Sequence, residues 1–139
     1  MSALAPYLMI ASAAVVFALG TVHLLFTFRG RQLQPRDAEL TARLQRSTLG
    51  ITRQTTVWKA WIGFNASHSL GAMLFAASYG YLALQHGPLL FSSEYLLALG
   101  LVVLCAYLWL AWRYWFSSPF YGIALALVLY LLAWILRWT

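Results

Sequence analysis

The chain has 139 residues and a formal net charge of +6; 63% of its residues are hydrophobic, 17% are aromatic and only 9% are charged. Soluble domains are usually about a quarter charged, so this composition excludes an ordinary soluble domain and indicates an integral membrane protein. Six arginines lie between the first two apolar runs, with Lys59 just behind them, and this uneven distribution favours a basic loop at a membrane over a nucleic-acid-binding patch.

The first apolar run, residues 4–28, is long enough to cross the hydrocarbon of a bilayer, which needs roughly 20 residues. No basic segment precedes it, and it exceeds the apolar core of a signal peptide, so we interpret it as a retained helix. Pro6 suits the first helical turn, where its missing N–H is not needed. The sequence Arg29-Gly30-Arg31 is expected to end the helix at the interface.

The hydrophilic stretch that follows predicts one short helix between Pro35 and Arg46. Asp37 and Glu39 fall in its first turn and basic residues in its last, as the helix dipole prefers, and Glu39 and Arg43 are correctly ordered for an i,i+4 pair. Apolar residues recur along one edge at helical spacing: Leu33, Leu40, Leu44 and Ile51. An apolar edge beside basic residues suits a helix on the membrane surface, and a solvated connector is the alternative.

Three further apolar runs follow, at residues 57–84, 93–112 and 119–136. Thr55 or Thr56 can cap the first of them, and Ser92 or Ser93 the second. Residues 85–88 separate these two runs with glycine and proline, which break helices.

Four spans with short connections predict an all-α fold, an integral membrane four-helix up-down bundle. We expect a single transmembrane domain over residues 1–139, with the short amphipathic helix in the first loop, residues 29–56. Because basic loops stay in the cytoplasm, this loop is expected to be cytoplasmic and both termini to lie on the other side of a bacterial inner membrane.

The second span carries two different faces on a wheel of 100° per residue. Trp61, Asn65 and His68 share one stripe. Roughly opposite lies a series of small residues, Gly63, Ser67 and Gly71, whose spacing lets another backbone approach closely. This series predicts assembly into a homo-oligomer or with another membrane protein.

Polar residues of the first two spans can form a pocket in the cytoplasmic half of the bundle, because such groups avoid lipid. Its candidate residues are His23, Thr27, Asn65, His68 and Ser69, with Trp58, Trp61, Trp109, Trp112 and Tyr121 as possible walls. From a boundary at Val57, His68 lies about 16 Å deep, close to mid-membrane, and His23 lies roughly 8 Å inside Phe28. The two histidines are therefore expected to differ in depth by roughly 8 Å.

Several chemistries compete for these residues. His23 and His68 from neighbouring helices can ligate a haem b, although the expected difference in depth argues against it. The spans contain no carboxylate and the chain only one cysteine, Cys105, so a metal site is not expected. The alternative to a binding site is a purely structural role, in which these side chains form hydrogen bonds only with one another.

The remaining hypothesis is an apolar ligand, such as a lipid, quinone or isoprenoid. His68, Asn65 and Ser69 would bind its polar head and tryptophans would pack against its body. The function expected is that of a binding or accessory subunit, and the alternative is a haem- or quinone-linked membrane enzyme that uses His23 and His68. The basic loop is expected to meet anionic lipid head groups.

Three stretches resemble small four-span bacterial inner-membrane proteins to which no activity is assigned. They are the stretches at residues 35–40, 51–56 and 58–71, so the resemblance covers the first two spans and their loop. It implies a membrane location and four spans, but no ligand.

Overall fold

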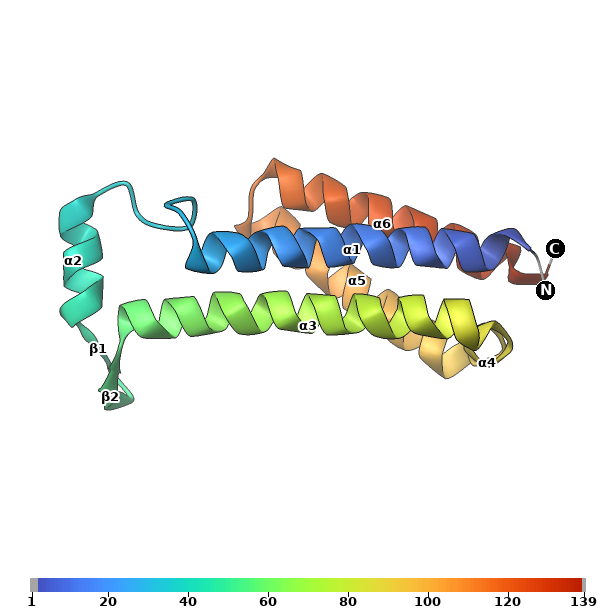
Figure 1. Cartoon of the computed structure of the whole chain (residues 1–139), viewed down its shortest axis with the longest axis horizontal. Helices are drawn as coiled ribbons and strands as arrows, with labels where there is room; N and C mark the ends of the chain where they lie inside the picture. The colour runs from blue at the N-terminus through green and yellow to red at the C-terminus, as the bar shows by residue number, and fades with distance from the viewer. Residues whose placement is uncertain (1–2, 139) are drawn as a thin grey trace. The chain divides into compact units, whose positions relative to one another are not determined.

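The computed structural model describes residues 3–138 and is mostly helical (Figure 1). Its helices are α1 (Leu4–Phe28), α2 (Ala38–Arg46), α3 (Val57–Gln85), α4 (Gly87–Ser92), α5 (Glu94–Tyr114) and α6 (Ser117–Ile135). Two short strands, β1 (Thr48–Leu49) and β2 (Thr52–Thr56), and a final 3-10 turn, η1 (Leu136–Trp138), complete the order. The chain is mostly helical, as predicted, and the order of the long helices is confirmed, whereas the two strands were not predicted.

Among the described residues, three helices are long and apolar enough to cross a membrane: α1, α5, and α6 continued by η1. This agrees with the prediction of a membrane protein with transmembrane helices. Helix α3 has sufficient length, 29 residues, but does not belong to this group. Its first half carries Lys59, Asn65 and His68, which lower its hydropathy. The fourth span and the four-helix bundle stay predictions.

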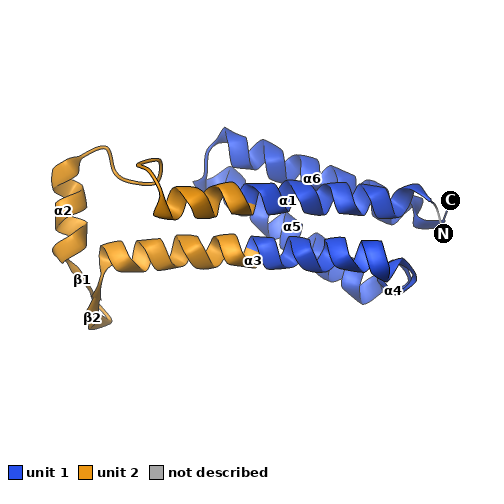
Figure 2. Ribbon diagram, viewed as in Figure 1, with its two compact units in different colours: residues 1–19, 72–139 blue, residues 20–71 orange. Residues whose placement is uncertain are grey.

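The chain divides into two compact units (Figure 2). Unit 1 contains the described residues up to Leu19 together with those from Ala72 onward, and unit 2 contains Gly20–Gly71. Both α1 and α3 therefore contribute one part to each unit.

Unit 1 holds a core of small and aromatic side chains. Tyr79 of α3 donates a hydrogen bond to the carbonyl of Leu96 (2.6 Å), and Tyr130 of α6 donates one to the carbonyl of Leu97 (2.8 Å). Gly100 of α5 lets the two tyrosines approach, because a Cβ there would lie 2.7 Å from Tyr79 Cε1 and would also collide with the Tyr130 hydroxyl. The core thus depends on a glycine in the middle of an apolar helix.

Polar side chains also join the elements of unit 1. Ser12 donates to the carbonyl of Ala126 (2.7 Å), which links α1 to α6 inside the apolar core. Arg137 is paired with Glu94 and donates to the carbonyl of Phe91 (3.3 Å), which ties η1 to α4 and α5. Ser93, one of the two predicted candidates, caps α5, since its side chain accepts from the backbone N–H of Leu96.

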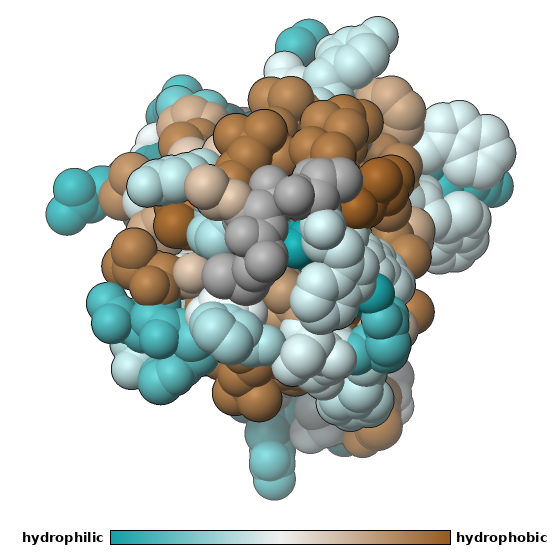
Figure 3. All heavy atoms as spheres, turned by 90° about the vertical axis from the view of Figure 1, so that its right-hand side faces the viewer, coloured by the Kyte–Doolittle hydropathy of each residue, from teal (hydrophilic) through white to brown (hydrophobic). Residues whose placement is uncertain are grey.

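Large apolar side chains reach the surface on every long helix, as expected where lipid is the solvent. Figure 3 shows brown, apolar side chains in several patches between pale and teal ones on the face that it draws. The exposed members in the middle of α5 and α6 include Leu99, Val102, Leu125 and Val128.

In unit 2, α2 forms within the predicted range of residues 35–46, but it begins at Ala38, and Asp37 is its N-cap and does not lie in its first turn. Asp37 caps the helix by accepting from the backbone N–H groups of Glu39 and Leu40, and Glu39 forms the predicted i,i+4 ion pair with Arg43. Gly30, just beyond α1, has a φ of +90°, a conformation that favours glycine.

A β-hairpin that the sequence analysis missed joins α2 to α3. Its strands β1 and β2 are antiparallel, with Thr48 opposite Thr56. The N–H of Val57 donates to the carbonyl of Ser47 (2.9 Å), so the hairpin is tied to the first residue of α3. Thr56 caps α3 as one of the two predicted candidates, because its hydroxyl oxygen accepts from the N–H of Lys59 (3.3 Å).

Candidate functional site

The predicted polar residues of the first two long helices meet inside unit 2. His23, near the end of α1, and Asn65, in the first half of α3, form a hydrogen bond of 3.0 Å between His23 Nε2 and Asn65 Oδ1. Both side chains are half-buried. This bond joins residues 42 positions apart and is a direct polar link between α1 and α3.

The neighbouring hydrogen bonds define which atom donates in the bond between Asn65 and His23. The Asn65 side-chain nitrogen donates to the carbonyl of Trp61 one turn earlier (2.8 Å), so its oxygen faces the histidine. An amide oxygen can only accept, and His23 Nε2 therefore carries the hydrogen of this bond. In the neutral ring the second nitrogen, Nδ1, is then an acceptor.

His68 lies against the same pair. Its ring and that of His23 meet edge to face, with centroids 5.4 Å apart and planes at 81°. The predicted difference in depth between the two histidines, roughly 8 Å, is wrong, because two rings with centroids 5.4 Å apart cannot differ more than that in depth.

The error lies in the assumption that α1 and α3 begin at the same level. Five residues separate His23 from the end of α1, whereas eight separate Asn65 and eleven separate His68 from the start of α3. Helix α3 thus extends three to six residues further than α1, which is roughly 5–9 Å at a rise of 1.5 Å per residue. Figure 1 shows this overhang of α3 beyond the end of α1.

Thr27 and Ser69 lie beside this cluster, and both are buried. Each hydroxyl donates to a carbonyl one turn earlier in its own helix, Thr27 to His23 (2.8 Å) and Ser69 to Asn65 (2.9 Å). Each carbonyl belongs to a residue of the cluster, so the hydroxyls support the backbone that presents His23 and Asn65. Their hydroxyl oxygens keep the capacity to accept a bond.

A pocket of about 400 Å³ lies one turn from Asn65 in the same unit. It is lined by Gln32, Leu33, Gln34, Pro35, Leu44, Trp58 and Trp61. Trp61 belongs to both features, because its carbonyl accepts from Asn65 and its indole N–H donates to the carbonyl of Leu33 (3.2 Å). The loop and α2 therefore close one side of the pocket and the tryptophans the other.

The lining residues from the loop and α2 were missed as site residues, although Leu33 and Leu44 had been assigned to an apolar edge of this loop. The other suggested walls, Trp109, Trp112 and Tyr121, belong to unit 1 and are exposed. Only Trp58 and Trp61 of the five suggested walls line this pocket.

The arrangement does not fit a haem held between His23 and His68. A haem with two axial histidines needs its ring plane between the two imidazoles. Here the rings are in edge-to-face contact, and Nε2 of His23 is bonded to Asn65. Within the described part of the chain, no cluster of three or more histidine, cysteine or acidic side chains has the spacing of a metal site.

The small-residue face of α3 is open. Gly63, Ser67 and Gly71 are exposed, and a Cβ at Gly63 would have no neighbour within 4 Å. The Ser67 hydroxyl donates to the carbonyl of Phe64 (3.0 Å) in its own helix. Ser67 thus does not face the His23–Asn65 pair.

Comparison of this chain with protein-family models, with curated proteins and with solved structures finds no match.

Proposed function

We propose that this membrane protein is a binding or accessory subunit. Its ligand is an apolar molecule with a polar head, namely a quinone, an isoprenoid or a lipid. The observation that carries the proposal is the cluster of His23, Asn65 and His68 next to a tryptophan-lined pocket in unit 2. Polar and ionisable groups in spanning helices are expensive and commonly mark ligand paths.

The chemistry of the cluster suits a head group that accepts and donates hydrogen bonds. The His23–Asn65 bond can open to offer one N–H donor and one amide oxygen, and the ring of His68 stands beside them. Trp58 and Trp61 give flat apolar walls for a ring or chain, with a volume close to that of small-ligand pockets.

The proposal includes α3 as a fourth span. Its 29 residues are about 43 Å long, more than the roughly 30 Å of hydrocarbon. Its polar residues Asn65 and His68 are directed at His23 of α1, so lipid is not their solvent. With four spans and the positive-inside rule, the loop of unit 2 is cytoplasmic and both termini lie outside, in a bacterial inner membrane.

We also propose that a second copy of the chain or another membrane protein packs on Gly63, Ser67 and Gly71. The space over Gly63 supports this part, since small residues at this spacing allow close helix packing.

The test is binding of defined probes to the full chain in detergent, followed by the change in the intensity or wavelength of tryptophan emission. The probes are a short-chain benzoquinone, a short-chain isoprenoid alcohol and a short-chain phosphatidylglycerol. For the probe that saturates, Asn65→Ala and His68→Ala should each weaken binding about two- to tenfold, the effect of one hydrogen bond. Ser67→Ala, next to His68 in the sequence but on the other face of α3, is the matched control and should not change probe binding.

Two outcomes contradict the proposal. If no probe gives a saturable signal, or if both variants bind as tightly as the unaltered protein, the polar cluster is a structural contact between α1 and α3. The enzyme alternative needs a redox cofactor, and an absorption spectrum of the purified protein with and without added hemin tests its haem form.

A further inference from the structure

Unit 2 carries most of the charge of the protein on one short stretch. Residues 29–59 hold seven of the nine basic residues and two of the three acidic ones, which leaves a net charge of +5. The seven basic residues are all exposed: Arg29, Arg31, Arg36, Arg43, Arg46, Arg53 and Lys59. This density of positive charge needs an anionic partner or a solvated surface.

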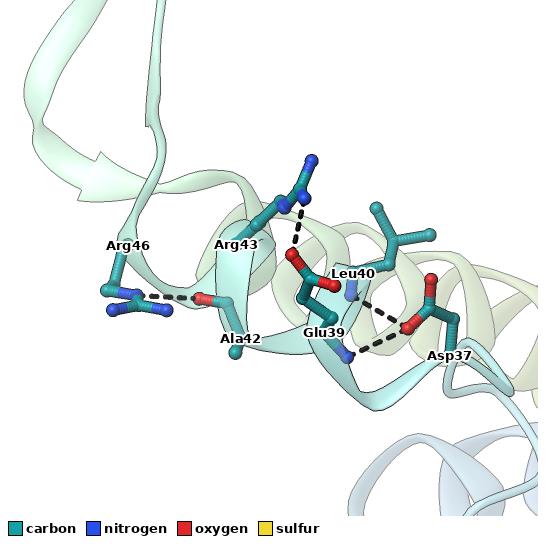
Figure 4. A network of polar contacts seen from close by, with 6 residues as sticks. All are labelled: Asp37, Glu39, Leu40, Ala42, Arg43 and Arg46. Carbon is teal, nitrogen blue, oxygen red and sulfur yellow. Dashed lines mark hydrogen bonds and ion pairs between the residues drawn. The ribbon is translucent and has the colours of Figure 1, made fainter.

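The two acids of this stretch are engaged inside α2 (Figure 4). Asp37 accepts from the N–H groups of Glu39 and Leu40, and Glu39 is paired with Arg43. Arg46 donates to the carbonyl of Ala42 (3.3 Å) in the same helix. Most of the positive charge is therefore not compensated by the acids of the same unit.

The position of this charge along the helix axes matches lipid head groups. Helix α3 extends roughly 5–9 Å beyond the end of α1. The head-group layer on each side of a bilayer is roughly 5–8 Å thick. The hairpin is bonded to the first residue of α3, and α2 precedes it, so both lie at the level of the head groups if α1 ends at the hydrocarbon boundary. Within unit 2, α2 lies across the direction of α1 and α3, as an interfacial helix does (Figure 1).

Apolar side chains accompany the cations on this surface. Ile51, at the turn of the hairpin, is 92% exposed, and Leu40 of α2 is 44% exposed. A solvated connector gains nothing from an exposed isoleucine at its tip. At a membrane interface the exposed isoleucine is favourable, because the interface accepts an apolar side chain beside cations that bind phosphate.

We infer that α2 and the β1–β2 hairpin form a docking surface for anionic phospholipid head groups of the membrane in which the protein resides. Arg36, Arg46 and Arg53 bind the phosphates, and Ile51 enters the interface. This surface is separate from the His23–Asn65 cluster, so the inference does not depend on the proposed ligand.

The test uses a spin label at the hairpin turn of the full chain in nanodiscs. Gly50 is the labelling position, because a Cβ there meets nothing within 4 Å and its φ is not in the left-handed region. Gly50→Cys is made together with Cys105→Ser, since Cys105 is exposed and would also react. Accessibility to a water-soluble nickel complex and to oxygen, which partitions into lipid, reports the position of the turn.

In phosphatidylglycerol discs the label should be less accessible to nickel and more accessible to oxygen than in phosphatidylcholine discs. Each basic residue near an anionic surface is worth roughly a fivefold shift, so R36Q, R46Q and R53Q combined should shift the docking equilibrium by roughly a hundredfold and remove the difference between the discs. The matched variant with lysine at the same three positions should keep the difference between the discs. In the labelled protein that keeps all its arginines, salt at about 1 M should reduce the difference between the discs, because the screening length falls to roughly 3 Å.

Equal accessibility in the two discs overturns the inference, and it leaves the probe-binding test of the His23–Asn65 cluster untouched. A difference that persists in the glutamine variant also overturns it, because charge is then not the cause. Apart from the scaffold protein, which is the same in both kinds of disc, the discs contain no other protein and no nucleic acid, so docking that differs between the discs needs neither.

Discussion

The hydrogen bond between His23 and Asn65 allows a quantitative test of how α1 and α3 are joined. Side-chain hydrogen bonds between membrane helices contribute about 0.6 kcal/mol on average and at most about 1.7 kcal/mol. The bond here is 3.0 Å long, and the second polar atom of Asn65 is held by the carbonyl of Trp61, so the amide is already oriented when the bond forms. We therefore expect a coupling energy of about 1 kcal/mol, above the average.

The assay is a double-mutant cycle on the free energy of unfolding in mixed micelles of increasing SDS content. The variants are His23→Ala, Asn65→Ala and the two combined. A control cycle pairs His23→Ala with Ser67→Ala, because the Ser67 hydroxyl donates to the carbonyl of Phe64 in its own helix. The control should be additive within about 0.3–0.5 kcal/mol. If the His23–Asn65 coupling is no larger than that of the control, the bond does not join the helices and the reasoning fails.

Two further predictions concern unit 1 and use the same unfolding assay. Gly100→Ala should destabilise the protein by about 1–3 kcal/mol, because its Cβ would press on the Tyr130 hydroxyl, which is held by a carbonyl. Gly80→Ala is its control and should be neutral or stabilising, since its Cβ would lie at an ordinary 3.5 Å from its nearest neighbour; equal losses for both would refute the packing argument. Arg137→Ala should cost about 1–3 kcal/mol and Glu94→Gln less than about 1, because the arginine side chain is 11% exposed and the glutamate 66%; the reverse order would refute this.

The long helices could be predicted from the sequence because apolar runs and caps are local signals. Leu4–Phe28 was predicted as residues 4–28, and the capping role of Thr56 was one of two alternatives. The short helix α2 was also predictable, since its acids and bases are ordered along the dipole. These features depend on neighbours within one or two turns.

The hairpin was missed although its signal is present. Threonines at positions 48, 52, 55 and 56 flank a Gly50-Ile51 turn, and β-branched residues around a glycine are typical of a hairpin. The strands are short and polar, and Ile51 also fits the helical spacing of Leu33, Leu40 and Leu44, so the sequence analysis assigned it to the apolar edge of a surface helix. The short helix α4 was missed for a similar reason, since its Pro88 was taken as a helix breaker although proline also begins helices.

The residues of the candidate site could be predicted from the sequence, but their positions relative to one another could not. The wheel places Asn65 and His68 on one face, but the register between α1 and α3 depends on how far the loop carries the chain before α3 starts. That distance is set by the hairpin and α2, which are not local to either histidine. The pocket beside Trp61 could not be predicted for the same reason, because the loop residues that line it are brought there by this connection.

The two faces of α3 make ligand binding and assembly separable. A partner helix on Gly63 would cover the side that carries Ser67, and the His23–Asn65 bond, directed at α1, would stay as it is. A large side chain at Gly63 should therefore disrupt an oligomer without weakening probe binding, whereas Asn65→Ala should weaken binding without changing the oligomer. If a change at either face alters both properties, the faces are coupled, and the polar cluster then serves assembly as well as any ligand.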